Sequence, residues 1–321
     1  MKLSIIIVSW NVGEDLLRCL ESIKVNRLCE RFETIVIDNG STDGTVETVK
    51  KSFPEVVIIA NDENRGFAAA NNQGIIQSKG EYVLLLNPDT IVHSGALDTL
   101  ISFMDSHPDV GVCGPKLLKE DGSIQRSVRR LPTFRAVLYR HTIFKLIGLF
   151  RSQYNKWMMK DFAYDCQKEV FQLMGAALLI RQSVIDEVGL MDETFFMYYE
   201  EVDLCYRIKR AGWRIVFIPE AVITHLGGKS AGQIPVDKQI MAMTSLLKFF
   251  KKHRGKFITG GFICIFKPAI VATHLINIII GTIKYAFAAA FNRNIREKSA
   301  EEIRNSTLLL LRHSWWSLFK R

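Results

Sequence analysis

The 321-residue chain is short of cysteine and proline, with six and eight residues respectively. The cysteines lie far apart, none forms a Cys-x-x-Cys pair, and no cluster has the spacing of a metal site. Because disulfide frameworks are typical of small secreted chains, we expect reduced, buried thiols. Glycine, at 21 residues, is also too scarce for a collagen-like or low-complexity chain, so the composition indicates a globular protein.

Two nucleotide-binding signatures and a secretory signal are also missing. The segment after the first apolar run is Ser9-Trp10-Asn11-Val12-Gly13. It lacks both the Gly-x-Gly-x-x-Gly pattern of dehydrogenases and the basic, Gly-rich phosphate loop of sugar nucleotidyltransferases. The N-terminal apolar stretch is shorter than a signal core and runs directly into polar residues. We therefore expect it to form a strand, in a protein whose body is cytoplasmic.

Charge is divided unevenly along the chain. Residues 245–321 hold 14 basic and 3 acidic residues, a net charge of +11, whereas the preceding 244 residues hold 28 and 30, a net charge of −2. A basic tail indicates a polyanionic partner, either nucleic acid or an anionic membrane surface. The basic residues of this tail alternate with long aliphatic runs, which favours a membrane and argues against nucleic acid.

Short apolar runs alternate with segments of helical periodicity over the first 115 residues. Strands are predicted at 4–9, 34–37, 56–60, 82–86 and 110–114, and helices at 13–24, 45–52, 66–78 and 96–106. Near-continuous apolar strands separated by helices predict an α/β fold with a mostly parallel sheet that is covered on both faces.

The pattern weakens between 117 and 168, where basic and aromatic residues mix, and we expect one or two helices there. Regular structure is predicted again at 170–180, followed by helices at 183–188 and 201–211 and a strand at 214–218.

Polar loops follow several predicted strands, and ligands of such sheets bind beyond the carboxyl ends of the strands. Asp38 ends the second strand, where it could accept a hydrogen bond from a pyrimidine imide N–H or belong to a helix-capping turn. Asp89, in the turn Asn87-Pro88-Asp89-Thr90, could bind a hard divalent cation or belong to a simple proline turn. Arg65 could reach a phosphate at a helix N-terminus or remain solvated.

The richest cluster of charge is Glu200-Glu201-Val202-Asp203. Carboxylates this close repel one another, which raises their pKa values unless a cation or a proton relieves them. One of them could act as a general base, or all three could simply favour a helix N-terminus. His225 ends another apolar run, where a lone histidine is either a ligand or a structural residue.

The order of these segments resembles that of the family 2 glycosyltransferases. The matching segments are SIIIVSWN, VIDNGSTDGT, NRGFAAANNQG, LLLNPDT, MGAALLIRQ, YYEEVDLCYRIKRAGW and THLGG, which together cover about residues 3–230. They are most similar to the rhamnosyltransferase-type branch that builds bacterial surface polysaccharides. The resemblance implies a GT-A fold and inverting, metal-dependent transfer. It also implies a nucleotide-sugar-binding half at 1–115 and an acceptor-binding and catalytic half at 116–244. The membrane-associating tail predicted at 245–321 rests on its basic and apolar composition.

The resemblance also implies roles for residues that would bind the donor and a metal. Asp38 matches the aspartate that contacts the nucleobase, and Asn64 and Arg65 lie in the segment that lines the nucleotide and its diphosphate. The donor implied is dTDP-rhamnose, with UDP- and GDP-sugars as alternatives. The metal, Mg²⁺ or Mn²⁺, would be held by the positions that match Asp89 and His225, with Asn87 where many relatives have an acid.

In the family's catalytic motif, Glu-Asp is usual and this chain has Glu200-Glu201. Position 201 aligns with the catalytic base, Glu200 is the competing candidate, and Asp203 could orient a neighbour or accept from the acceptor hydroxyl. The implied acceptor is a lipid-linked or polysaccharide hydroxyl. The alternative hypotheses are a non-catalytic membrane-bound scaffold that binds nucleotide sugars and a sugar nucleotidyltransferase.

The tail contains an apolar stretch at 257–283 that only Lys267 interrupts. Its uncharged part, 268–283, has 16 residues, fewer than the roughly 20 of a spanning helix. Basic residues flank the stretch on both sides, which argues against a single crossing. We expect peripheral attachment to the cytoplasmic leaflet of the cell membrane, with a spanning helix as the alternative. Trp315, Trp316 and Phe319 would extend the apolar character of the tail.

Overall fold

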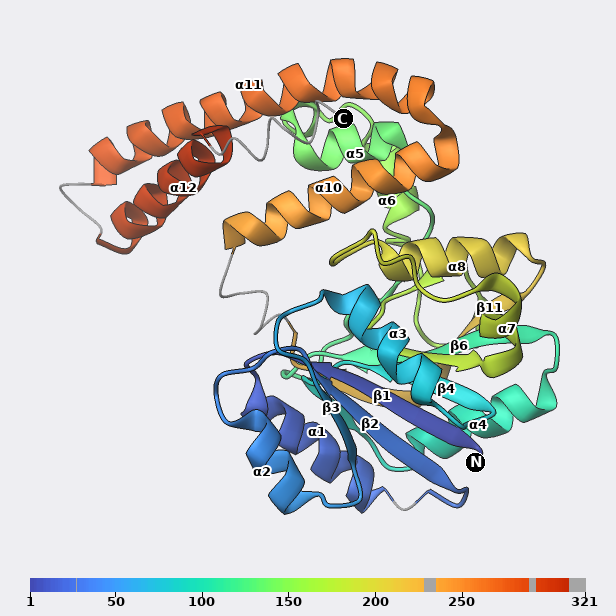
Figure 1. The fold of residues 1–321 in the computed structure, drawn as a ribbon. Coiled ribbons are helices and arrows are strands. Elements are labelled where there is room, and N and C mark those ends of the chain that lie inside the picture. Colours follow the sequence, from blue (N-terminus) through green and yellow to red (C-terminus); the bar gives the residue numbers. More distant parts are fainter. Residues whose placement is uncertain (27, 228–234, 289–292, 312–321) are drawn as a thin grey trace. The chain divides into compact units, whose positions relative to one another are not determined.

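The computed structural model describes residues 1–26, 28–227, 235–288 and 293–311, which form two compact units (Figure 1). Unit 1 comprises Met1–Leu131 and Met159–Gln233, and unit 2 comprises Pro132–Met158 and Ile234–Arg321. The predicted boundary at 115 falls inside a strand of unit 1, and that at 244 falls inside a helix of unit 2. Segment 132–158 folds with the C-terminal helices. Trp315, Trp316 and Phe319 lie outside the described residues.

Unit 1 is built on a mostly parallel sheet, with nine strands in the described residues. Its order is β3-β2-β1-β4-β10-β6-β11-β5, with β8 also paired to β11. The strands are β1 (Leu3–Ser9), β2 (Phe32–Asp38), β3 (Val57–Ala60), β4 (Tyr82–Leu86), β5 (Thr90–Val92), β6 (Val110–Leu118), β8 (Lys168–Glu169), β10 (Ala177–Arg181) and β11 (Arg214–His225). The α/β prediction is confirmed.

Several strands depart from the predicted pattern. The apolar segment predicted at 170–180 is divided into β9 (Gln172–Leu173) and β10, and β10 runs antiparallel to both β4 and β6. β5, which was not predicted, runs antiparallel to β11 at the edge of the sheet. The prediction at 214–218 was too short, because β11 continues to His225.

Side chains of both faces of the sheet are buried, as the near-continuous apolar strands predict. In β1, Leu3, Ile5 and Ile7 belong to one core cluster, while Ile6 and Val8 belong to the other, since successive strand residues point to opposite faces. The first cluster includes helices α1 (Gly13–Val25), α2 (Thr45–Ser52) and α4 (Ala96–Ser106), and the second includes α3 (Phe67–Gln77), α7 (Gln182–Val188) and α8 (Glu200–Arg210).

The prediction of buried thiols was correct for only half of the cysteines. All six are free; Cys19, Cys113 and Cys205 are buried, whereas Cys29, Cys166 and Cys264 are exposed.

Unit 2 is helical in its described residues. Its elements are α5 (Phe134–His141), the 3₁₀ helix η1 (Ile143–Lys145), α6 (Arg151–Trp157), α10 (Pro235–Arg254), α11 (Lys256–Ala288) and α12 (Arg293–Leu311). The ring of Phe134 lies 4.5 Å from the rings of both Phe250 and Phe262, which joins segment 132–158 to the C-terminal helices. Among the described helices, α11 alone is long and apolar enough to cross a membrane.

The loop before α8 is tied to the start of α3, and this contact requires a glycine. The Phe67 amide donates to the Phe196 carbonyl (2.7 Å), and Gly66 has φ +86°. A Cβ atom at Gly66 would lie only 2.6 Å from the Phe196 carbonyl oxygen. Because that neighbour is backbone, the loop that leads to Glu200 would have to move.

Gly66→Ala should therefore lower the free energy of unfolding by about 2–4 kcal/mol, because it combines an unfavourable φ with a backbone clash. Gly95→Ala is the matched control: Gly95 also has a positive φ (+72°), but nothing lies within 4 Å of its added Cβ. We expect it to cost about 1 kcal/mol. Urea unfolding of both variants measures the difference, and equal losses would contradict the role of the Phe196 contact.

Candidate active site

The predicted site residues lie at one edge of the sheet of unit 1. β1 pairs in parallel with β2 on one side and β4 on the other, so the carboxyl ends of all three strands meet at that edge. Asp38 is the last residue of β2, and Asn87 directly follows β4.

Asp38 is buried and only partly satisfied. Its Oδ2 accepts from the Ser41 amide (2.9 Å), while Oδ1 is buried and has no hydrogen-bond partner among the described residues. A buried acceptor without a partner is costly, so a ligand that donates to Oδ1 would stabilise the site. An imide N–H of a pyrimidine is such a donor.

Asn39, which the sequence analysis missed, holds the neighbouring loop beside Asp38. Its Nδ2 donates to Asn64 Oδ1 (2.9 Å), and its Oδ1 accepts from the Arg65 amide (3.1 Å). Asn64 Oδ1 also accepts from the Gly66 amide (3.0 Å). The Arg65 side chain is exposed, where it can meet a phosphate. The only sequence signal for Asn39 is that it follows Asp38.

Asn87, Asp89 and His225 are brought together in space. His225 Nε2 lies 3.2 Å from Asp89 Oδ1 and 3.3 Å from Asn87 Nδ2. The pairing of β5 with β11, which places His225 opposite Thr90, produces this contact. On the other side of the ring, His225 Nδ1 lies 2.8 Å from Gln125 Oε1 and can donate to it. Gln125 lies 100 residues away in the sequence and was not predicted.

This cluster suits a divalent cation. Burial would raise the pKa of Asp89, but the contact with His225 and hydrogen bonds from the backbone amides of Asp89 and Gly227 together hold that pKa below its ordinary value, which favours the ionised carboxylate. Carboxylate oxygen and imidazole nitrogen are both ligands of such ions. Among the described residues no group of three His, Cys, Asp or Glu side chains could hold a metal, so a cation here would need ligands from a bound substrate. Asn87 Oδ1, buried without a hydrogen-bond partner in the described chain, is a further candidate oxygen.

The two glutamates at the start of α8 differ in their surroundings. Glu200 is buried and its Oε2 has no hydrogen-bond partner in the described part of the chain; burial, with the adjacent Glu201 charge, raises the pKa of Glu200 well above its ordinary value. Burial also raises the pKa of Glu201, but the positive charge of Arg129 opposes that rise. Burial therefore favours the protonated form of both groups, and more strongly that of Glu200, so Glu201 is the more readily ionised of the pair.

A two-stranded sheet supports the Glu201 side chain. β7 (Val128–Arg129) pairs with β9 in a register that places Arg129 opposite Gln172. Gln172 Nε2 lies 3.5 Å from Glu201 Oε1 and donates to it, and a Cβ atom added at Gly175 would lie 3.4 Å from Glu201 Cβ. Arg129 and Gln172 were missed because their proximity to Glu201 arises only from this pairing.

The turn before β10 connects the glutamates to the cluster of Asn87, Asp89 and His225. Gly175 packs against Glu201, and the carbonyl of the next residue, Ala176, accepts from the Asn87 amide (2.9 Å). Asn87 in turn contacts His225. The candidate base and the candidate metal ligands therefore belong to one connected arrangement.

Asp203 lies apart from these contacts, in an ion pair within the protein. Its side chain is fully buried (0% exposed), and Asp203 Oδ2 lies 2.9 Å from Arg207 Nε. Arg207 also donates to the carbonyls of Val188, Gly189 and Leu190. The pair thus fixes the first turns of α8 to the end of α7.

We expect Asp203→Ala to lower the free energy of unfolding by about 3–5 kcal/mol, because Arg207 would lose its buried partner. The folded enzyme should keep its kcat within a few-fold. Lys209→Ala is the control: Lys209 pairs with the exposed Glu169 and should cost at most about 1 kcal/mol. Chemical unfolding and kcat are measured on the same samples. A more than hundredfold fall in kcat of Asp203→Ala with an unchanged free energy of unfolding would contradict the structural role of Asp203.

Arg129→Gln should move the acidic limb of the kcat–pH profile to higher pH. Arg129 lowers the pKa of Glu201, so without its charge the glutamate ionises only at higher pH. Glu200, Tyr198 and Cys205 also interact with Glu201. Burial raises the pKa of both Tyr198 and Cys205 to about 12, which keeps them neutral over this range.

The control for this profile is Arg126→Gln, because Arg126 is exposed and donates to the Lys160 carbonyl. The electrostatic role of Arg129 would be contradicted if the kcat–pH profiles of the two variants coincided. It would also be contradicted if the acidic limb of Arg129→Gln moved to lower pH.

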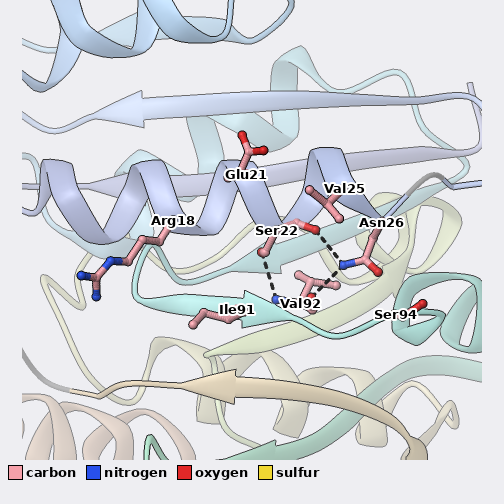
Figure 2. A pocket seen from close by; sticks show the side chains of 8 residues that line it. All are labelled: Arg18, Glu21, Ser22, Val25, Asn26, Ile91, Val92 and Ser94. Carbon is pink, nitrogen blue, oxygen red and sulfur yellow. Dashed lines mark hydrogen bonds between the residues drawn. The ribbon is translucent and has the colours of Figure 1, made fainter.

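A hollow along α1 and β5 contains none of these residues (Figure 2). Its polar side chains form hydrogen bonds with the backbone of the edge strand β5: Ser22 Oγ accepts from the Val92 amide (3.0 Å), and Asn26 Nδ2 donates to the Val92 carbonyl (2.7 Å). These bonds protect the free edge of the sheet, so the hollow has a structural explanation.

Comparison with known sequences identifies the family. The model of the family described as "Glycosyl transferase family 2" matches residues 4–188. The chain is 32% identical over 247 residues to an N-acetylglucosaminyl-diphospho-decaprenol L-rhamnosyltransferase of Mycobacterium tuberculosis, which covers 73% of this chain and 78% of that protein. It is 29% identical over 212 residues to the low-salt glycan biosynthesis hexosyltransferase Agl10 of Haloferax volcanii, covering 65% of this chain and 62% of that one. The chain belongs to glycosyl transferase family 2.

Solved structures agree in fold. The mannosyltransferase PcManGT from Pyrobaculum calidifontis, in complex with GDP-Man and Mn²⁺, matches 97% of this chain and 87% of its own with a TM-score of 0.55 and 14% identity. GalNAc-T7 with UDP, GalNAc and Mn²⁺ matches 70% of this chain and 44% of its own, with a TM-score of 0.52 and 17% identity. These matches confirm the predicted GT-A fold, and family and fold together define a glycosyltransferase.

Proposed function

We propose that the protein transfers rhamnose from dTDP-rhamnose, with inversion, to a hydroxyl of a lipid-linked or polysaccharide acceptor at the cytoplasmic face of the cell membrane. The observation that carries the proposal is the connected arrangement of Glu201, Asn87, Asp89 and His225 at the same sheet edge as the incompletely satisfied Asp38. The donor and the acceptor class are supported by the name of the mycobacterial relative, a rhamnosyltransferase acting on a diphospho-decaprenol lipid.

Glu201 is the base in this proposal. Its carboxylate takes the proton of the acceptor hydroxyl as that oxygen forms a bond to C1 of the donor sugar, and the bond between C1 and the diphosphate breaks. A single displacement inverts C1 and needs no covalent intermediate. Gln172 donates to Oε1 and orients the carboxylate, and burial favours the protonated form of Glu200 more strongly than that of Glu201.

The nucleoside diphosphate would be held at the neighbouring loops. Asp38 Oδ1 accepts a hydrogen bond from the nucleobase of the donor, and Arg65 meets the diphosphate beside the N-terminus of α3. Asp89 and His225 would hold Mg²⁺ or Mn²⁺, which stabilises negative charge on the departing diphosphate. These assignments are supported by the paired positions of the two side chains and by the Mn²⁺ in the two fold relatives.

Membrane attachment is supported by composition and by α11. Helix α11 is long and apolar, and most of its surface is exposed within the described chain. Attachment would bring the enzyme to lipid-linked acceptors, as the substrate name of the mycobacterial relative suggests.

Thermal unfolding with a panel of dTDP-, UDP- and GDP-sugars, with and without Mn²⁺, tests donor and metal together. We expect dTDP-rhamnose with Mn²⁺ to raise the unfolding temperature, because a ligand at a hundred times its Kd stabilises by about 2.7 kcal/mol. Asp89→Ala should abolish the metal-dependent part of this shift. Glu201→Gln should keep the shift but lose about 10²–10⁴-fold in turnover.

Asp62→Ala, which removes an exposed carboxylate from unit 1, is the control and should behave as wild type. Full turnover in Glu201→Gln would refute the base. A shift with no turnover on any acceptor would favour a non-catalytic scaffold that binds nucleotide sugars, and the absence of any shift in a folded sample would contradict the donor assignment.

A further inference from the structure

The turn after η1 exposes three large apolar residues within four positions, on both sides of Gly148. Leu146 and Ile147 are 68% and 72% exposed, and Leu149 is exposed as well. The turn has a defined shape: the Leu146 amide donates to the Ile143 carbonyl (2.9 Å), and the Leu149 amide donates to the Phe144 carbonyl (3.0 Å). Its apolar tip is therefore presented to the surroundings by a hydrogen-bonded backbone.

The base of this turn is anchored in unit 2. The rings of Phe144 and Phe150 pack edge to face at 5.8 Å, and Arg135 stacks on the Phe150 ring. Thr142 is buried and accepts from the Phe144 amide through its Oγ1. Both α5 and η1 contact α11, so the turn belongs to the same body as the long apolar helix.

Helix α11 has one packed side and one exposed apolar side. The buried residues recur every three or four positions in its first two thirds, at Thr259, Phe262, Phe266, Ile270 and His274. Exposed apolar residues occupy other positions along the same helix, at Ile258, Ile265, Leu275, Ile279 and Ile283. A helix with this division is suited to lie along an interface with its exposed side in the apolar phase.

The packing of α12 argues against α11 crossing a bilayer. α12 packs along α11, where Gly281 allows close approach because an added Cβ would lie 2.8 Å from Ile303. α12 carries exposed charges at Arg296, Glu301 and Glu302. A spanning α11 would draw these charges toward the hydrocarbon, whereas an in-plane α11 leaves them in water.

Charge complements the apolar surface. Unit 2 holds 20 basic and 4 acidic residues, a net charge of +16, whereas unit 1 has a net charge of −7. Segment 132–158 contains no acidic residue and five basic ones: Arg135, Arg140, Lys145, Arg151 and Lys156. Exposed apolar side chains among unbalanced cations fit a bilayer with anionic headgroups, since the cations meet the headgroups and the apolar tips enter the acyl boundary.

We propose that the Leu146–Leu149 turn is a second membrane-inserting element, which acts with the exposed side of α11 to hold unit 2 on an anionic bilayer in a monotopic manner. This inference rests on the membrane attachment in the proposed function and adds a contact site far from the tail in sequence.

The test is co-sedimentation of the full chain with vesicles of equal parts phosphatidylglycerol and phosphatidylcholine. Ile147→Asp should weaken binding at least about tenfold, because it replaces an inserting side chain by a charge. Ile76→Asp is the matched control: Ile76 is 68% exposed, close to the 72% of Ile147, lies on α3 of unit 1, and receives the same change of charge. It should bind within about twofold of wild type. Thermal unfolding of both variants confirms that each is folded, as expected for substitutions at exposed positions.

The outcomes separate this inference from the proposed function. If wild type binds and Ile147→Asp binds equally well, only the turn is excluded. If wild type does not bind vesicles, membrane attachment fails as a whole, and turnover on a soluble acceptor analogue in the same preparation decides whether the transferase proposal stands. If Ile147→Asp instead abolishes self-association measured by sedimentation velocity without lipid, the surface is a protein interface and the inference is overturned.

Discussion

The arrangement of the site depends on the hydrogen bond from the Asn87 amide to the Ala176 carbonyl. β10 runs antiparallel to β4, with Ala177 opposite Leu86, so the turn that enters β10 lies beside the residue that leaves β4. Gly175 in that turn meets Glu201, and Asn87 meets His225. In an all-parallel sheet the entry to the neighbouring strand would lie at the opposite edge. The reversal of β10 is therefore what brings the candidate base and the candidate metal ligands together.

The electrostatics of this edge follow from the same geometry. Asp38, Asp89, Glu200 and Glu201 are carboxyl groups there, and the proposed donor carries a negatively charged diphosphate. Two features reduce the repulsion: burial favours the protonated form of Glu200, and the contact with His225 stabilises the Asp89 charge. Neither supplies the positive charge that a diphosphate needs. Arg65 and a cation between the substrate and Asp89 would supply it, so the proposed metal requirement follows from charge as well as from ligand type.

The sequence predicted what depends on local pattern and missed what depends on strand pairing. The helices predicted at 45–52 and 96–106 agree with α2 and α4 at both ends, because apolar periodicity is a local property. An apolar run does not encode direction, so the reversal of β10 could not be foreseen. Arg129 and Gln125 reach Glu201 and His225 from distant segments and left no local signal. Asp203 did leave one, since Arg207 follows it at the i+4 spacing of a helical ion pair.

The net charge of +9 is the sum of a basic unit 2 and an acidic unit 1, and this division affects how the protein would attach to a membrane. An anionic surface attracts unit 2 and repels unit 1 over about one Debye length, roughly 8 Å at physiological salt. The apolar turn and α11 also depend on one another for their structure. Phe134, in the helix that precedes the turn, packs on Phe250 and Phe262 of the C-terminal helices. Without those helices, segment 132–158 would expose that ring as well, so the segment belongs structurally to unit 2 although both of its sequence neighbours belong to unit 1.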